Sequence, residues 1–183
     1  MKSETITEAE ADPATYPDAP EGLSAAAAAL DADMLWSRIE AYIAHRYSSR
    51  QVTWLVEGKG HWGFPLKPAT LTSAEKWTGE EWETVTLAVS PYGYCLDDEG
   101  PYRIVASVGG GSVPAPVQEA YRRLAEYLAP GQPDNMLFGR PGVSSHSGTV
   151  GDLTETYDRS PAWIAKAMQY SGAADLLRNY RRA

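Results

Sequence analysis

The residue types that most often bind metals are sparse in this chain. It has three histidines, and the spacing between His45, His61 and His146 does not match that of metal ligands. The single cysteine, Cys95, provides no thiolate cluster and no intrachain disulfide. We therefore predict no metal-binding residue and no cofactor.

One short stretch contains the residue types of a hydrolytic triad. Ser144, Ser145, His146 and Asp152 lie in the sequence GVSSHSGTVGD. Triad catalysis needs a rigidly held nucleophile, and this stretch has neither a G-x-S-x-G elbow nor a strand before it and a helix after it. We predict no catalytic residue here, and keep a small hydrolase using this loop as an alternative.

Three further patterns could support chemistry. The run Gly109-Gly110-Gly111 could cradle a phosphate, but the following prolines make a flexible strand-to-helix joint the better interpretation. Acids cluster at 80–83 and 97–99, between expected strands, where carboxylates are usually solvated. A carbohydrate-acting enzyme with a tryptophan platform remains an alternative, although such side chains more often form core or interface. The six tryptophans are Trp36, Trp54, Trp62, Trp77, Trp82 and Trp163.

The last 25 residues carry the most informative pattern. They place apolar groups at helical spacing and hold five basic residues, Arg159, Lys166, Arg178, Arg181 and Arg182, against one acid, Asp175. Such a segment is suited to docking on another protein chain. The expected partner-binding residues are Trp163, Ile164, Met168, Leu176, Leu177, Arg178, Tyr180, Arg181 and Arg182.

Composition limits the range of functions. The chain has 183 residues and a net charge of −8, which suits one domain with tails and disfavours general nucleic-acid or anionic-membrane binding. The lone cysteine fits a reducing cytoplasm. The N-terminus is acidic and lacks the pattern of a signal peptide, and we expect no transmembrane helix, because no apolar run is long enough.

Composition shifts divide the chain into four parts. Residues 1–22 hold six acids and one lysine and predict an N-terminal arm without a core of its own. Residues 23–129 predict a core domain, residues 130–158 a Gly/Pro/Ser-rich linker, and residues 159–183 a C-terminal docking arm.

The expected elements follow from periodicity. Ser24 and Asp31 or Asp33 are candidate N-caps, and an amphipathic helix is expected over 34–47. Alternation predicts strands from Gln51, at 69–77, 82–89, 92–96 and 102–108, with a loop at 59–68. A second helix is expected with Pro114 or Pro116 in its first turn and an end at Pro130-Gly131, and Gly172 is expected to divide the C-terminal arm.

The predicted fold class is α+β and mainly helical. Two packed core helices would carry an inserted small antiparallel β meander and extended N- and C-terminal arms. The expected core between the helices consists of Leu35, Ile39, Ile43, Val117, Tyr121 and Leu124.

The order of these parts resembles a known family. The pattern Gln51-Val52-Thr53-Trp54 follows the first helix, Pro116-Val117 to Leu124-Ala125 forms the second, and SGAADLLRNYR closes the chain from Ser171 to Arg181. These sequences are similar to those of the head–tail connector, or adaptor, proteins of long-tailed phages and gene transfer agents. The resemblance covers 30–128 and the tail.

The resemblance implies a structural protein rather than an enzyme. Members form a ring, usually of twelve copies, below the portal at one capsid vertex. Their C-terminal segments bind the portal, their other face receives the next connector or stopper protein, and DNA passes through the lumen without specific binding. The implied location is the neck of the virion, after synthesis in the host cytoplasm, with no membrane partner.

Overall fold

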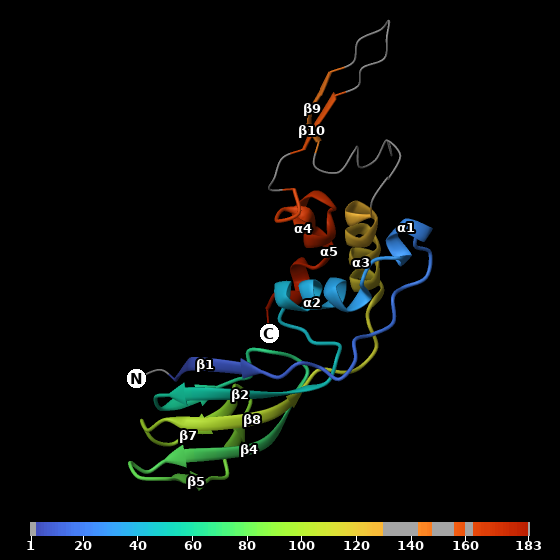
Figure 1. The fold of residues 1–183 in the computed structure, drawn as a ribbon. Coiled ribbons are helices and arrows are strands. Elements are labelled where there is room, and N and C mark those ends of the chain that lie inside the picture. Colours follow the sequence, from blue (N-terminus) through green and yellow to red (C-terminus); the bar gives the residue numbers. More distant parts are fainter. Residues whose placement is uncertain (1–2, 130–142, 148–155, 160–162, 183) are drawn as a thin grey trace, which may run out of the picture. The chain divides into compact units, whose positions relative to one another are not determined.

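The fold is described from a computed structural model that covers residues 3–129, 143–147, 156–159 and 163–182 (Figure 1). The chain divides into two compact units. We call residues 1–17, 40–112 and 180–183 the sheet unit, and residues 18–39 and 113–179 the helix unit. Helix α2 (Ala32–Tyr42) begins in the helix unit and ends in the sheet unit.

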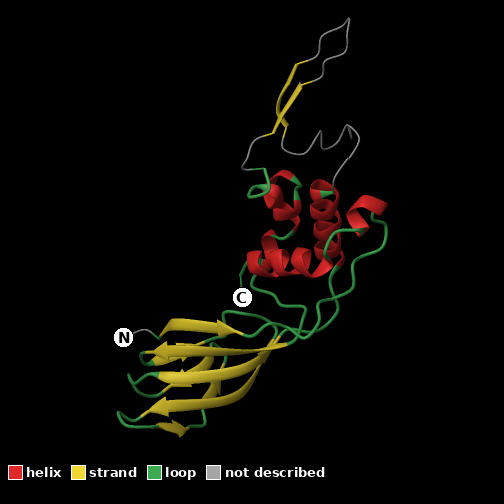
Figure 2. Ribbon diagram, in the orientation of Figure 1, coloured by secondary structure: helices red, strands yellow, loops and turns green. Residues whose placement is uncertain are grey.

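A five-stranded antiparallel sheet dominates the sheet unit (Figure 2). Its order is β1-β2-β8-β4-β5, and the bounds are β1 (Glu4–Glu10), β2 (Arg50–Glu57), β4 (Ala69–Trp77), β5 (Trp82–Thr84) and β8 (Tyr102–Val108). The alternation predicted for the strand from Gln51 is confirmed, because Val52, Trp54 and Val56 are all buried.

A smaller antiparallel sheet shares a core with the first. It consists of β3 (Gly60–Trp62), β7 (Gly93–Leu96) and β6 (Ala88–Ser90), in that order. Buried residues from both sheets form one apolar cluster: Val52, Trp54, Val56, Trp62, Leu66, Ala74, Leu87, Leu96, Tyr102, Ile104, Ala106 and Val108. Burial of this surface supplies the main driving force for folding of the unit.

Three helices before residue 130 build the helix unit. Helix α1 (Ala25–Ala28) begins at the expected cap, where the Ser24 side chain accepts from Ala27 N–H at 3.2 Å. Asp31 caps α2 in the same way, accepting from the N–H groups of Asp33 and Met34. Helix α3 (Ala115–Leu128) contacts α2 through Tyr121, whose ring centroid lies 4.9 Å from that of Trp36.

The C-terminal residues form three short helices, of which the first two pack against α3. They are α4 (Ala167–Tyr170), α5 (Ala173–Leu176) and the 3-10 helix η1 (Arg178–Tyr180). Gly172 has φ +76° and separates α4 from α5, as expected. Farther up the chain, β9 (Val143–Ser147) and β10 (Thr156–Arg159) form an antiparallel hairpin.

The predicted fold class, mainly helical, is wrong. The chain is built mainly of antiparallel β-sheet with short helices, not of helices with a small inserted meander. Two errors explain this. The acidic residues 4–10 pair with β2 as an edge strand, instead of forming an arm, and Gly60–Trp62 is a strand within the expected loop. The C-terminal arm is not extended either, because it packs on α3.

Two element boundaries also differ from expectation. The first helix ends at Tyr42, so His45 and Tyr47 lie beyond it rather than on it. The strand expected over 82–89 is two strands, β5 and β6, which belong to different sheets. Alternation continues across the break because Val85 and Leu87 both face the shared core between the two sheets.

Candidate partner-binding surfaces

The expected docking residues divide into buried and exposed members. Met168 and Leu177 are buried within the chain itself, at 7% and 0% exposure, so the prediction that another protein covers them needs correction. Ala167 and Ala173 are buried beside them, because α4 and α5 pack against α3. Ile164 is 51% exposed, and Trp163 and Leu176 are half-buried.

The exposed part of this segment is both apolar and cationic. Tyr170 is 53% exposed, and the Lys166 ammonium lies 5.8 Å from the centre of its ring. Arg178 is exposed and lies 3.6 Å from the Asp175 carboxylate, an i,i+3 pair open to solvent. We call Ile164, Lys166, Tyr170 and Arg178 the C-terminal surface set.

The last residues of the chain belong to the sheet unit. The Ala44 N–H donates to the Tyr180 carbonyl at 2.8 Å, and the Arg181 guanidinium lies 4.9 Å from the centre of the Tyr42 ring. Tyr180 is half-buried, and its ring meets that of His45 edge-on at 5.5 Å. Arg181 and Arg182 are exposed.

All six expected core residues are buried, but they do not form one helix-to-helix seam. Leu35, Ile39, Val117, Tyr121 and Leu124 belong to the helix unit, each at 1% exposure or less. Ile43 is also buried but follows the end of α2 and belongs to the sheet unit. Burial raises the pKa of Tyr121, and the charges of Asp31 and Asp33 act in the same direction.

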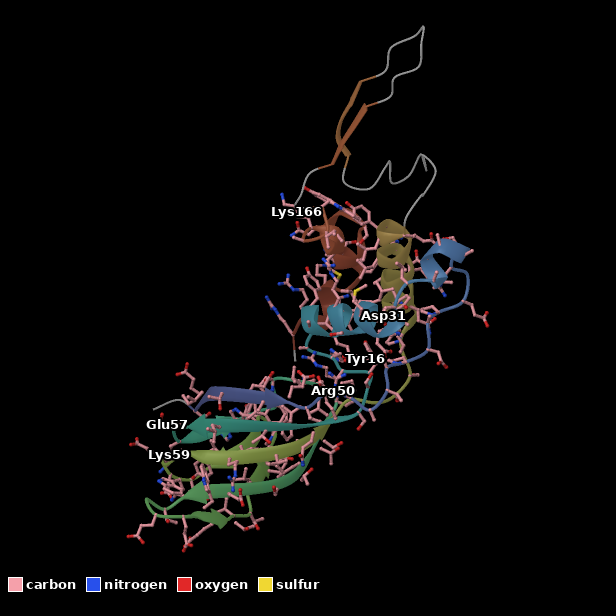
Figure 3. All side chains as sticks on the ribbon, in the orientation of Figure 1. Tyr16, Asp31, Arg50, Glu57, Lys59 and Lys166 are labelled. Atoms are coloured by element: carbon pink, nitrogen blue, oxygen red, sulfur yellow. The ribbon has the colours of Figure 1, made fainter. Side chains whose placement is uncertain are left out.

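A buried network of ion pairs joins the N-terminal strand to the residues that follow α2. Glu10 binds Arg46 at 2.6 Å and Arg50 at 2.7 Å, and Arg50 also pairs with Glu40. Figure 3 labels Arg50 and Tyr16, whose ring centre lies 5.6 Å from the Arg50 guanidinium. Glu40 accepts from the backbone N–H groups of Tyr47 and Ser48, which satisfies its second oxygen.

This network lowers the pKa of Glu10. Burial alone would raise the pKa of Glu10, but the hydrogen bonds and positive charges of Arg46 and Arg50 outweigh it, so the pKa lies below its ordinary value of 4.5. Burial also raises the pKa of Tyr47, with smaller contributions from Tyr180 and Glu40. The arrangement fixes structure, since every charge in it is already paired.

The closest approach to a catalytic grouping lies on the small sheet. His61 and Cys95 are directly opposite on β3 and β7, with Cys95 Sγ 3.5 Å and Ser90 Oγ 3.1 Å from His61 Nδ1. His61 lies in an exposed strand rather than in the Gly-rich loop expected for it. Both partners lie at the same ring nitrogen on an exposed face, and among the described residues no hydrogen bond to Nε2 orients the imidazole.

The other chemical candidates receive no support. Gly109 N–H donates to the Pro68 carbonyl at 2.9 Å, so it is not free to bind a phosphate. Trp36, Trp54 and Trp62 are core residues, and all six clustered acids are exposed: Glu80, Glu81, Glu83, Asp97, Asp98 and Glu99. Asp152 and the side chains of Ser144, Ser145 and His146 lie outside the part that the structure describes.

An apolar groove of about 860 Å³ opens on the sheet unit. Its lining includes His45, Phe64, Pro65, Lys67, Pro68 and Tyr92. Tyr92, in the turn between β6 and β7, is 77% exposed, and Val89 on β6 is 78% exposed. This surface was not predictable from local sequence patterns, because its residues come from three separate segments. The exposed aromatic in the turn SPYGY was the available signal.

In residues 3–129, 143–147, 156–159 and 163–182, we found no group of three His, Cys, Asp or Glu side chains placed to hold a metal ion. Within the same described residues, the helices are too short and too polar for any of them to cross a membrane.

Comparison with known proteins gives no assignment. No family model matches the chain, and neither the curated proteins nor the solved structures contain a match.

Proposed function

We propose that this chain is a structural adaptor that joins the portal to the next tail or stopper protein in a tailed phage or a phage-like particle. It forms a ring below the portal, of twelve copies as in the family that it resembles, and DNA passes through the ring. The protein has no enzymatic activity in this proposal. It assembles at the neck of the virion after synthesis in the host cytoplasm.

The observation that carries the proposal is the C-terminal segment. Its sequence SGAADLLRNYR resembles the closing segment of head–tail connectors. In the structure Leu177 buries this sequence against the chain, and the residues just before it, Ile164 and Tyr170, are exposed to solvent. Exposed aromatic and aliphatic groups beside cations are typical of the central residues of protein interfaces.

The charge distribution supports a protein partner. The chain carries a net charge of −8, yet residues 163–182 hold only one acid, Asp175, and four basic residues: Lys166, Arg178, Arg181 and Arg182. A portal surface that combines apolar pockets with carboxylates would complement the C-terminal surface set. The acidity of the chain as a whole also favours a DNA conduit, because it keeps phosphates from adhering to the lumen.

Because the C-terminal segment is folded, its deletion is not a clean test of docking to the portal. Deleting residues 160–183 would remove Leu177 and Met168 from the helix unit, so a loss of attachment could follow from unfolding. Substitutions at exposed positions avoid this problem. We expect Ile164→Asp combined with Tyr170→Asp to leave the circular dichroism spectrum and the melting temperature unchanged.

The functional readout is attachment to heads. Purified wild-type chain should co-sediment with portal-bearing, DNA-filled heads of the source particle and allow tails to join. The double variant should bind at least tenfold more weakly, whereas Met34→Asp, at an exposed apolar residue of α2, should bind normally. Normal joining of heads and tails by the double variant would refute docking through this surface.

A further inference from the structure

The apolar groove of the sheet unit is a preformed cleft. Phe64 forms part of its wall and packs against Trp62 and Tyr94, with ring centroids 5.3 and 5.5 Å apart. The Lys67 segment is held by two backbone bonds, from Lys67 N–H to the Ala44 carbonyl and from Arg46 N–H to the Lys67 carbonyl. A rigid apolar cleft loses little entropy when it binds a peptide.

The groove also has a cationic edge. Lys67 provides the charge, and among the described residues no carboxylate forms a salt bridge with its ammonium. Tyr92 adds an exposed aromatic ring to the lining of the groove. An occupant of matching chemistry would carry adjacent large apolar side chains and one or more acids.

The chain itself contains such a sequence. Residues 130–142 read PGQPDNMLFGRPG, in which Met136, Leu137 and Phe138 are consecutive, Asp134 lies two residues before them and Arg140 two residues after them. Three large apolar residues in a row are unusual within a stretch otherwise made of Gly, Pro and polar residues. Consecutive large apolar residues that contact only water are unfavourable, and such a run is typical of a segment that binds an apolar surface.

We propose that the groove of one copy binds residues 134–138 of a second copy. Leu137 and Phe138 would occupy the apolar part of the cleft beside Phe64 and Tyr92, and Asp134 would approach Lys67. The inference rests on the proposed function, since a ring is formed by repeating one such contact between different surfaces of adjacent copies. It adds the surface through which those copies recognise one another.

A binding experiment tests the contact directly. The probe is a fluorescently labelled peptide of residues 132–140, titrated into the full chain carrying Leu137→Asp and Phe138→Asp, so that no internal copy competes. We expect saturable binding, weakened at least tenfold by Tyr92→Ala and by Lys67→Glu. Val89→Ala is the matched control, because Val89 is equally exposed on the same hairpin but does not line the groove.

A cross-linking experiment distinguishes a second copy from the same copy. Tyr92→Cys and Phe138→Cys are placed in separate chains, each with Cys95→Ser, mixed and oxidised. A disulfide-linked dimer in the mixture, absent from either chain alone, supports the proposal. A disulfide that forms only within one chain carrying both substitutions would overturn it, as would a peptide that fails to bind.

The two proposals fail differently. If the peptide does not bind but Ile164→Asp with Tyr170→Asp still abolishes attachment to heads, the groove contact is wrong and the adaptor function stands. If the groove contact forms dimers or rings while heads and tails join without the C-terminal surface set, the contact stands and portal docking through that surface is wrong.

Discussion

The carboxylate of Glu10 lies 2.6 Å from the Nε of Arg46, and its second oxygen lies 3.0 Å from Arg46 Nη2. This two-point contact joins the end of the edge strand β1 to the segment that leaves α2. Arg46 in turn donates to the carbonyls of Glu40 and Ile43, near the C-terminal end of that helix. One ion pair therefore holds both a strand and a helix terminus.

Removing the acid of this pair should destabilise the sheet unit. Glu10→Gln leaves Arg46 and Arg50 nearly buried with a weaker acceptor, and we expect a loss of about 2 kcal/mol in urea unfolding. That is less than the roughly 3–5 kcal/mol typical of a fully buried pair, because the Glu10 side chain keeps 23% of its surface exposed. Asp98→Asn, which breaks the solvent-exposed pair with Lys76, is the control and should cause no measurable change.

The same pair predicts a pH dependence. Because the pKa of Glu10 in the folded chain lies below 4.5, the unfolded chain binds the proton more readily, so the contribution of Glu10 to stability is complete above that pH. It is lost as the pH falls through the lower folded pKa. The melting temperature of the wild-type chain should therefore fall between about pH 5 and pH 3. The melting temperature of Glu10→Gln should fall less steeply over the same range. Parallel curves for the two proteins would contradict this.

The glycine run after β8 should tolerate substitution unevenly. A Cβ on Gly109, at φ +99°, would lie 2.2 Å from the Ser48 carbonyl oxygen, whereas a Cβ on Gly110, at φ +94°, would meet no atom within 4 Å. Both alanine variants carry the cost of positive φ, about 1–3 kcal/mol. We expect Gly109→Ala to cost at least about 1 kcal/mol more in chemical denaturation. Equal losses would show that the backbone relaxes freely there.

The buried and exposed members of the C-terminal segment should separate in a stability assay. Leu177→Ala removes a side chain with no exposed surface and should cost about 2–5 kcal/mol. Ile164→Ala, at 51% exposure, should change the free energy of unfolding by about 0.5 kcal/mol or less. Similar losses at both positions would mean that the packing of α5 on α3 is misassigned.

Several features of this protein follow from the sequence alone. The caps at Ser24 and Asp31 were predictable because an N-cap is a local contact, made within three residues of the helix start. The strands at 69–77 and 102–108 match β4 and β8, since alternation is a local pattern with a period of two. The burial of Ile39, Val117 and Leu124 follows from helical periodicity in the same way.

Other features depended on contacts between residues far apart in the chain. The six acids of residues 1–22 predicted an arm without a core of its own, yet Glu10 is paired with Arg46 and Arg50, and Trp54 donates to Glu8. No local pattern shows that a charged segment will become an edge strand, because its pairing partner lies forty or more residues away.

The C-terminal segment shows the same division. Its helical spacing and positive charge were readable from the sequence, and so was the break at Gly172. The sequence could not decide whether Leu177 or Ile164 faces outward, since both are large apolar residues that suit a core or an interface equally well. Packing against α3 decided it, because only the assembled tertiary structure determines which apolar side chains leave water.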